Sequence, residues 1–290
     1  MPTTLAICAL LIWSTLAVSV VSLSALPPLL TTGLALIGGG ALGLPWVRWR
    51  HLRARPLLVG SAAMLGYHAL YFLSLQTADP VAANLLHYLW PLFIIVLTPL
   101  MLKRQGGHAL ARHHVAAGLL GFAGAAACVG AVPAFNASAW LGYTLALVSA
   151  LVWAYFSVWS RRFAEVPTST VSLYCLAAGV VSLAIYAAPA PTWASAMATA
   201  DLPVLSLDLK QWLTLGYLSL GPLGGAFYLW DYAMKKGNPH RIALFAYAVP
   251  VVSTLFVHVF LGRRVEPATL QGALLVTAAV GLGNRPARRA

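Results

Sequence analysis

The sequence predicts an all-α integral membrane protein, with ten transmembrane helices arranged as two inverted five-helix repeats. Three observations support this prediction. The 290 residues are 60% hydrophobic and only 8% charged, whereas a soluble domain carries about 25% charged residues. Apolar runs of roughly 20 residues, enough to cross a bilayer, recur along the chain. The basic residues gather in short clusters between these runs. This composition excludes a soluble globular enzyme and a disordered chain, and it disfavours an outer-membrane β-barrel.

Proline, glycine and charged residues divide the chain into ten apolar segments, each expected to form one span. Pro27-Pro28 separates the first two segments, and Asp79-Pro80 predicts a tight turn between the third and fourth. The connection 189–209 is the only long one. The segments are 3–25, 29–47, 57–78, 80–102, 115–132, 138–160, 168–188, 210–234, 240–261 and 267–283.

The distribution of positive charge predicts the orientation. With ten spans, 15 of the 18 Lys and Arg residues fall on one side of the membrane, and only Lys210, Arg263 and Arg264 fall on the other. Because cytoplasmic loops are enriched in Lys and Arg, both termini are expected in the cytoplasm. The net charge of +12 is explained by this bias, so we expect no nucleic-acid partner. The first 25 residues lack a basic leading stretch, which favours a retained first span over a removed signal peptide.

An internal repeat connects the two halves. Shifting the chain by 159 residues aligns 66–104 with 225–263 without a gap. The identical pairs include Gly66/Gly225, Pro80/Pro239, Leu85/Leu244, Tyr88/Tyr247, Pro91/Pro250 and Arg104/Arg263. Five spans are an odd number, so the second copy must be inverted in the membrane. We therefore expect a first repeat over residues 1–134 and a second over 135–290, a design typical of transporters.

These features resemble the drug/metabolite transporter superfamily, EamA type. The resemblance rests on the five-plus-five repeat, on tryptophans in spans one and six, and on mid-span prolines in spans four and nine. The segment NLLHYLWPL at 84–92, with Tyr67-His68 before it, is similar to the YddG-type exporters of aromatic and other neutral amino acids. The resemblance implies a central cavity lined by spans one, three, four, six, eight and nine, and export from the cytoplasm across a bacterial inner membrane.

Aromatic and polar residues cluster at the predicted middle of the membrane, where they are costly and usually functional. Tyr67, His68 and Tyr71 share one helix face, and Asn84, His87, Tyr88 and Pro91 form a single stripe. Such side chains suit a pocket with aromatic walls and a few hydrogen-bonding groups. Packing and helix–helix hydrogen bonding are the alternatives for each. The candidate substrate-binding residues are Trp13, Tyr67, His68, Tyr71, Asn84, His87, Tyr88, Trp90, Trp153 and Tyr247.

Four residues are candidate hinges or gates. Pro91 and Pro250 occupy equivalent mid-span positions, where proline removes a backbone hydrogen bond and kinks the helix. Gly221 and Pro222 mark a weak point in span eight. Static kinks that shape a cavity and hinges for alternating access are equally compatible with these residues.

Absent motifs narrow the function further. The sequence has no phosphate-binding GxxxxGK[ST] loop, no metal-ligand cluster and no paired carboxylates, so we expect neither an enzyme nor a cofactor or metal. The carboxylate of Asp231 is explained by an i, i+4 pair with Lys235. We expect facilitated diffusion, with coupling through a histidine such as His68 as the alternative. No Lys or Arg lies at mid-depth, which disfavours phosphorylated substrates.

The sequence thus predicts an exporter of neutral or aromatic amino acids and related metabolites that works by alternating access within the lipid bilayer. Two alternatives remain open. One is a broad drug or metabolite exporter of the same fold, and the other is a channel or scaffold without a carrier cycle. The oligomeric state is left open.

Overall fold

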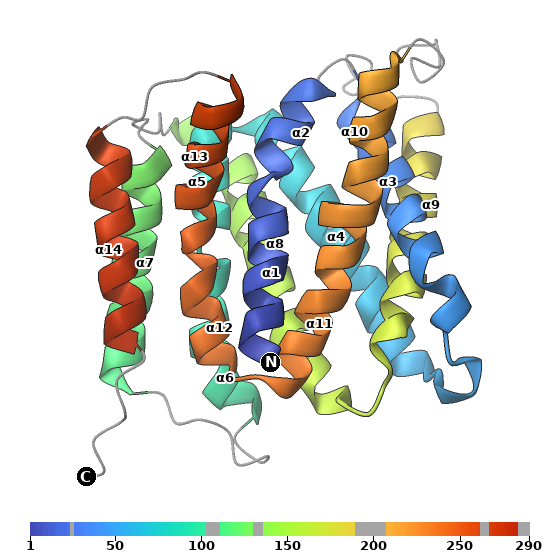
Figure 1. The fold of residues 1–290 in the computed structure, drawn as a ribbon, viewed down its shortest axis with the longest axis horizontal. Helices are drawn as coiled ribbons and strands as arrows, with labels where there is room; N and C mark the ends of the chain where they lie inside the picture. Colours follow the sequence, from blue (N-terminus) through green and yellow to red (C-terminus); the bar gives the residue numbers. More distant parts are fainter. Residues whose placement is uncertain (24–25, 103–110, 130–135, 189–206, 262–266, 284–290) are drawn as a thin grey trace.

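The computed structural model describes residues 1–23, 26–102, 111–129, 136–188, 207–261 and 267–283. Within these ranges the regular structure is helical throughout, and the helices lie side by side in one bundle (Figure 1). The α-helices are α1 (Pro2–Ser14), α2 (Leu16–Ser22), α3 (Pro28–Gly43), α4 (Ala54–Thr77), α5 (Pro80–His87), α6 (Trp90–Leu102), α7 (Arg112–Val129), α8 (Trp140–Trp159), α9 (Val171–Ala187), α10 (Leu209–Leu220), α11 (Ala226–Lys236), α12 (Pro239–Ala246), α13 (Ala248–Leu261) and α14 (Pro267–Gly283).

The expectation of an all-helical membrane protein is confirmed for these residues. Six helical stretches are long and apolar enough to cross a bilayer: Pro28–Trp46, Ala54–Thr77, Pro80–Leu102, Ala137–Phe163, Thr168–Ala187 and Pro239–Phe256. Pro2–Ser14 and Pro267–Gly283 are apolar but shorter. Each of the ten expected segments contains helix, and the number of spans stays a prediction. The repeat boundary at 134/135 lies outside the described residues. So do several of the Lys and Arg residues used to predict the orientation, at 103–104, 263–264 and 285–289.

Two equivalent turns begin helices in the same way. Asp79 caps α5, its carboxylate accepting from the Ala82 amide at 2.8 Å, and Pro80 is the first helical residue. Asn238 caps α12 in the same manner, and Pro239 follows it. An Asx side chain satisfies an amide that has no intrahelical partner, and proline lacks the amide that would need one. The predicted tight turn at Asp79-Pro80 is therefore present.

The helix breaks in these two segments are placed by proline. α5 ends at His87. In an unbroken α-helix the His87 carbonyl would accept a hydrogen bond from the amide of residue 91, but Pro91 has no amide hydrogen. α12 likewise ends at Ala246, four residues before Pro250. The breaks fall at Tyr88–Leu89 and at Tyr247, so both predicted kinks lie one turn before the proline itself.

The predicted weak point at Gly221-Pro222 forms a π-helix over Gly221–Gly225, between α10 and α11. The amide of Ala226 donates to the carbonyl of Gly221, five residues earlier. In an α-helix the Ala226 amide would donate to the Pro222 carbonyl instead. The wide turn therefore leaves the Pro222 carbonyl without this backbone donor.

The first expected segment, 3–25, differs from the prediction because it is divided between α1 and α2. The hydroxyl of Thr15 donates to the Ile12 carbonyl at 2.7 Å and lies 2.7 Å from the Tyr217 hydroxyl. A threonine side chain that bonds to its own backbone competes with the helical pattern, which accounts for the break. The hydroxyl of the neighbouring Ser14 donates to the Leu10 carbonyl within α1.

Close backbone contacts join the helices. α3 packs against α9, α4 against α8, α1 against α11, and α7 against α14; Figure 1 shows the α7–α14 pair at one edge and α3 with α9 at the other. A Cβ atom on Gly39 of α3 would lie 2.5 Å from the Leu223 carbonyl oxygen and 2.6 Å from the Gly224 Cα. Glycine at this position therefore allows α3 to approach the π-helix, as expected for a small-residue contact.

One end of the bundle is rich in cations, and we call it the basic end. It is the end at which α1 begins and α8 and α11 finish, at the bottom of Figure 1. Its described cations include Arg48, Arg161, Arg162, Lys235 and Lys236.

Candidate functional site

A cluster of aromatic rings joins four helices near the middle of the bundle. The ring of Trp13 in α1 lies 5.8 Å from Trp153 in α8 and 5.3 Å from Trp230 in α11, centroid to centroid. Phe227 of α11 contacts both Trp13, at 5.6 Å, and Trp153, also at 5.6 Å. Trp90 of α6 completes this group at 5.5 Å from Trp230. These spacings are those of favourable edge-on and tilted aromatic pairs.

A second, more polar group of rings continues the cluster along α4. Tyr67 lies 5.2 Å from Trp153 and 5.4 Å from His87 of α5. Tyr71 lies 4.4 Å from His87. His68 contacts Tyr67 at 4.5 Å and, at 6.0 Å, Phe227. We refer to all these rings together as the ring cluster: Trp13, Tyr67, His68, Tyr71, His87, Trp90, Trp153, Phe227 and Trp230.

Hydrogen bonds fix the polar members of the ring cluster. The Tyr71 hydroxyl donates to Asn84 Oδ1 at 2.7 Å. His87 Nδ1 lies 2.9 Å from Ser149 Oγ, whose own hydrogen is donated to the Ala146 carbonyl at 2.7 Å. Because that hydrogen is already used, Nδ1 of His87 must be the donor in this pair. Its Nε2 is then the acceptor atom of the neutral ring.

His68 adopts the same tautomer for a different reason. Its Nδ1 lies 2.8 Å from the Met64 carbonyl, which can only accept. Nδ1 therefore carries the hydrogen, and Nε2 of the neutral ring is an acceptor. Two buried imidazoles, both in contact with the Tyr67 ring, thus offer acceptor nitrogens.

Trp13 links the ring cluster to the π-helix. Its indole Nε1 donates to the Pro222 carbonyl at 2.9 Å, which is the carbonyl that Ala226 does not serve. The predicted weak point at Gly221-Pro222 is therefore held by a side chain of α1.

Exposure differs among the members of the ring cluster. Six of its rings are almost fully buried: Trp230 is 2%, Trp153 4%, Phe227 5%, His68 5%, Trp90 6% and His87 6% exposed. Trp13, Tyr67, Tyr71 and Asn84 are half-buried. Tyr71 and Asn84 lie on α4 and α5, the two helices joined by the Asp79-Pro80 turn.

Two expected site residues are not members of the ring cluster. Tyr88 is half-buried at the break between α5 and α6 and interacts electrostatically with Tyr67 and Tyr71. Tyr247 is fully buried and packs with Ala125 of α7 and Val276 of α14, where a Cβ atom on Gly121 would lie 2.4 Å from its ring. The structure thus places Tyr247 in a separate cluster, because the break in α12–α13 turns it towards the α7–α14 pair.

Phe227 and Trp230 were missed by the sequence reasoning, although a signal existed. The 159-residue shift that defines the repeat aligns Phe227 with His68 and Trp230 with Tyr71. The equivalent positions of the two halves therefore meet in one cluster.

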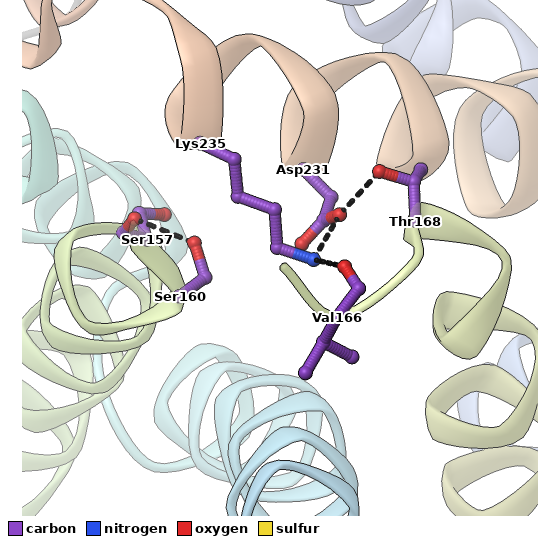
Figure 2. A network of polar contacts seen from close by, with 6 residues as sticks. All are labelled: Ser157, Ser160, Val166, Thr168, Asp231 and Lys235. Atoms are coloured by element: carbon purple, nitrogen blue, oxygen red, sulfur yellow. Dashed lines mark hydrogen bonds and ion pairs between the residues drawn. The ribbon is translucent and has the colours of Figure 1, made fainter. Parts of the chain in front are cut away.

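Polar contacts close the basic end below the rings. Figure 2 shows Asp231 and Lys235 on α11 reaching towards the segment that joins α8 to α9. Lys235 Nζ lies 2.8 Å from Asp231 Oδ2 and donates to the Val166 carbonyl at 3.0 Å. The Thr168 hydroxyl donates to the same carboxylate oxygen at 2.8 Å. The predicted i, i+4 pair is therefore present, but it is buried and tied to another segment.

Two arginines extend this closure. Arg161 donates to the carbonyls of Met234 and Gly237 at the end of α11, and Arg162 donates to the Met101 carbonyl at the end of α6. The end of α8 is therefore fastened to helices of both halves of the chain.

An apolar helical bundle with a buried aromatic cluster fits a membrane transporter, and the comparisons with known proteins show that class. The EamA-like transporter family model matches residues 2–130 and again 140–284. The chain therefore belongs to the EamA-like transporter family.

Individual relatives are similar over nearly the whole chain. The aromatic amino acid exporter YddG of Ancylobacter novellus is 35% identical, over 95% of this chain and 92% of its own. The YddG exporter of Salmonella typhimurium is 23% identical over 94% and 93%. A probable terminal-alkyne amino-acid exporter of Streptantibioticus cattleyicolor is 28% identical over 86% and 78%. A solved crystal structure superposes with a TM-score of 0.87 at 32% identity, covering 100% of this chain and 99% of the other.

Proposed function

We propose that the protein exports neutral amino acids, aromatic ones above all, from the cytoplasm across a bacterial inner membrane. The observation that carries this proposal is the ring cluster. Its rings and their hydrogen-bond partners include no Lys, Arg, Asp or Glu among the described residues. An aromatic substrate side chain would gain about 0.5–1.5 kcal/mol from each ring pair, and its ammonium up to about 2 kcal/mol over a desolvated ring face.

The polar groups suit the two ends of an amino acid. The carbonyl oxygen of Asn84 and the Nε2 atoms of His68 and His87 accept hydrogen bonds, as an ammonium requires. The tyrosine hydroxyls and the Asn84 amide donate them, as a carboxylate requires. The names of the relatives support this substrate class, since two are aromatic amino acid exporters and a third is named for another amino acid.

We infer that the chain forms ten spans in two inverted repeats, 1–134 and 135–290, with both termini and the basic end in the cytoplasm. The double match of the family model supports the repeat, and the cluster of cations at one end supports the orientation. In this orientation the hydrogen bonds of Lys235, Arg161 and Arg162 would hold the cytoplasmic end closed.

Alternating access would then require the basic end to open. The breaks before Pro91 and Pro250 and the π-helix at Gly221-Pro222 are the points at which the helices could bend. We propose these as the hinges. Transport is proposed to be facilitated diffusion, because the ring cluster contains no carboxylate for proton coupling. Strict coupling of proton flux to substrate flux would refute that part.

Counterflow of labelled phenylalanine in proteoliposomes tests the proposal. Accumulation that leucine and threonine inhibit, and that sugar phosphates do not, is the expected result. Inhibition only by cationic drugs would favour a broad drug exporter, and conductance without counterflow would favour a channel.

A matched pair of variants connects the activity to the site. Tyr71→Phe removes the hydroxyl that bonds to Asn84, which is worth about 0.5–1.5 kcal/mol, or roughly 2- to 13-fold in apparent affinity. Tyr155→Phe makes the same change on the outer face of α8, where Tyr155 is 44% exposed. The first variant is expected to weaken phenylalanine counterflow and the second to leave it unchanged; equal effects would remove the ring cluster from the binding site.

A further inference from the structure

A polar cavity of about 410 Å³ lies at the basic end, outside the ring cluster. Three segments form it: the end of α3 and the turn after it, the segment that joins α8 to α9, and the end of α11. Its lining includes Trp46, Arg48, Glu165, Ser169, Tyr232 and Lys236.

The charges around this cavity favour an anion. Lys235 also lines it, but its ammonium is neutralised by Asp231. Glu165 is the one carboxylate of the lining, and its Oε1 lies 3.9 Å from Arg53 Nη1. Arg48 and Lys236 are exposed at the rim, and neither forms an ion pair with another described residue. Two cations are therefore left to hold an anion in the cavity.

The hydrogen-bond donors of the lining point to a phosphate group. The helical stretch Thr168–Ala187 begins at the cavity wall. Its first internal hydrogen bond runs from the Thr170 amide to the Pro167 carbonyl, so the amides of Thr168 and Ser169 precede the helical pattern. Amides at a helix start favour phosphate oxygens. The hydroxyls of Ser169 and Tyr232 and the fork of Arg48 add further donors.

The surroundings show where such a phosphate comes from. Trp46 lines the cavity and is 66% exposed, and the nearby Trp49 is 62% exposed. Exposed tryptophans at the end of a span are typical of the headgroup layer of a membrane. Basic pockets between helices at this level suit the headgroups of anionic lipids.

We propose that this cavity binds a phosphate-bearing anion, namely the headgroup of an anionic phospholipid, between Arg48 and Lys236. The bound headgroup joins the end of α3 to the end of α11. Because α11 is tied through Lys235 and Thr168 to the segment 164–169 (Figure 2), the lipid stabilises the closed basic end.

Native mass spectrometry of the delipidated protein, titrated with phosphatidylglycerol or with phosphatidylcholine of the same acyl chains, tests the proposal. Phosphatidylglycerol is expected to bind more tightly and to raise the melting temperature. The double variant Arg48→Gln/Lys236→Gln should weaken its binding about 30-fold, the equivalent of ~2 kcal/mol for two cations. The control Arg55→Gln/Arg112→Gln removes two exposed arginines at the starts of α4 and α7 that do not line the cavity, and it should bind like the wild type.

A charge-neutralising variant separates binding from folding. Glu165→Gln removes a carboxylate from the cavity wall and should tighten the binding of phosphatidylglycerol, which a structural defect would not do. Equal loss in the double variant and its control, or equal binding of the two lipids, would overturn the proposal. Saturation by glycerol 3-phosphate at the same affinity, lost in the double variant, would assign the site to a soluble phosphate ester and overturn the lipid source.

Discussion

Replacing Lys235 by methionine removes the ammonium that neutralises Asp231 while keeping a side chain of similar length. The side chains of Lys235 and Asp231 are only 4% and 3% exposed. The variant leaves a buried carboxylate with the Thr168 hydroxyl as its remaining donor and removes the donor to the Val166 carbonyl. Two hydrogen bonds of a charged donor, at about 1.5–3 kcal/mol each, agree with the ~3–5 kcal/mol that removal of one partner of a buried ion pair costs.

A double variant shows how much of this cost comes from the unpaired charge. In Asp231→Leu/Lys235→Met both charges are replaced by apolar side chains, a change that is often nearly neutral for a buried pair. The Val166 carbonyl still loses its donor, at about 1–3 kcal/mol. The double variant is therefore expected to be more stable than Lys235→Met alone.

The cysteines of the chain provide the assay. Cys128 is 3% and Cys175 0% exposed, so a thiol-reactive fluorophore labels them as the detergent-solubilised protein unfolds. The midpoint is expected to fall by about 6–20 °C in Lys235→Met, at roughly 2–4 °C per kcal/mol for a chain of this size. Lys210→Met, which changes an exposed lysine at the start of α10, is the control and should move the midpoint little. A double variant less stable than Lys235→Met, or equal shifts in the two single lysine variants, would refute the reasoning.

Three further changes test other contacts. Trp13→Phe keeps a ring but loses the indole bond to the π-helix, so it should cost about 1 kcal/mol and slow counterflow; an unchanged melting midpoint would contradict this. Gly39→Ala places a methyl group 2.5 Å from a carbonyl oxygen and should destabilise by about 1–3 kcal/mol, whereas Gly216→Ala, with nothing within 4 Å, should not destabilise. Ser149→Ala removes the acceptor of His87, at about 1–3 kcal/mol, and counterflow that keeps its wild-type affinity for phenylalanine would show that this histidine does not contact substrate.

Local features of the fold were predictable because they depend on neighbours in the sequence. A proline without an amide hydrogen ends the helix one turn earlier, so Pro91 and Pro250 located both breaks to within a turn. The same holds for the Asp79 cap and for the pair of Asp231 with Lys235. Sequence also placed aromatic residues of spans one, three, four and six at one level, and the structure brings Trp13, Tyr67, His87 and Trp153 together.

Contacts between distant segments could not be read in the same way. The attachment of Lys235 to Val166 crosses 69 residues, and no periodicity reveals it. Tyr247 was expected among the substrate-binding residues, yet it lies at the break between α12 and α13 and packs against α7 and α14. The repeat aligns Trp230 with the candidate residue Tyr71. This alignment predicts Trp230 as a site residue only if residues aligned by the repeat also lie close together in the fold.

The wide turn at Gly221–Gly225 affects how the chain tolerates changes in length. A π-turn holds one residue more than an α-turn, so the faces of α10 and α11 are related as if one residue had been inserted between them. Deleting Gly224 would return this stretch to an ordinary α-helix and leave Phe227 and Trp230 facing the same partners, although the Pro222 carbonyl would then be served by the backbone instead of by Trp13. A deletion inside α8 has no such reserve, because every later side chain would turn by about 100°. The helical segment that carries Phe227 and Trp230 is thus also the one in which the loss of one residue is expected to be tolerated.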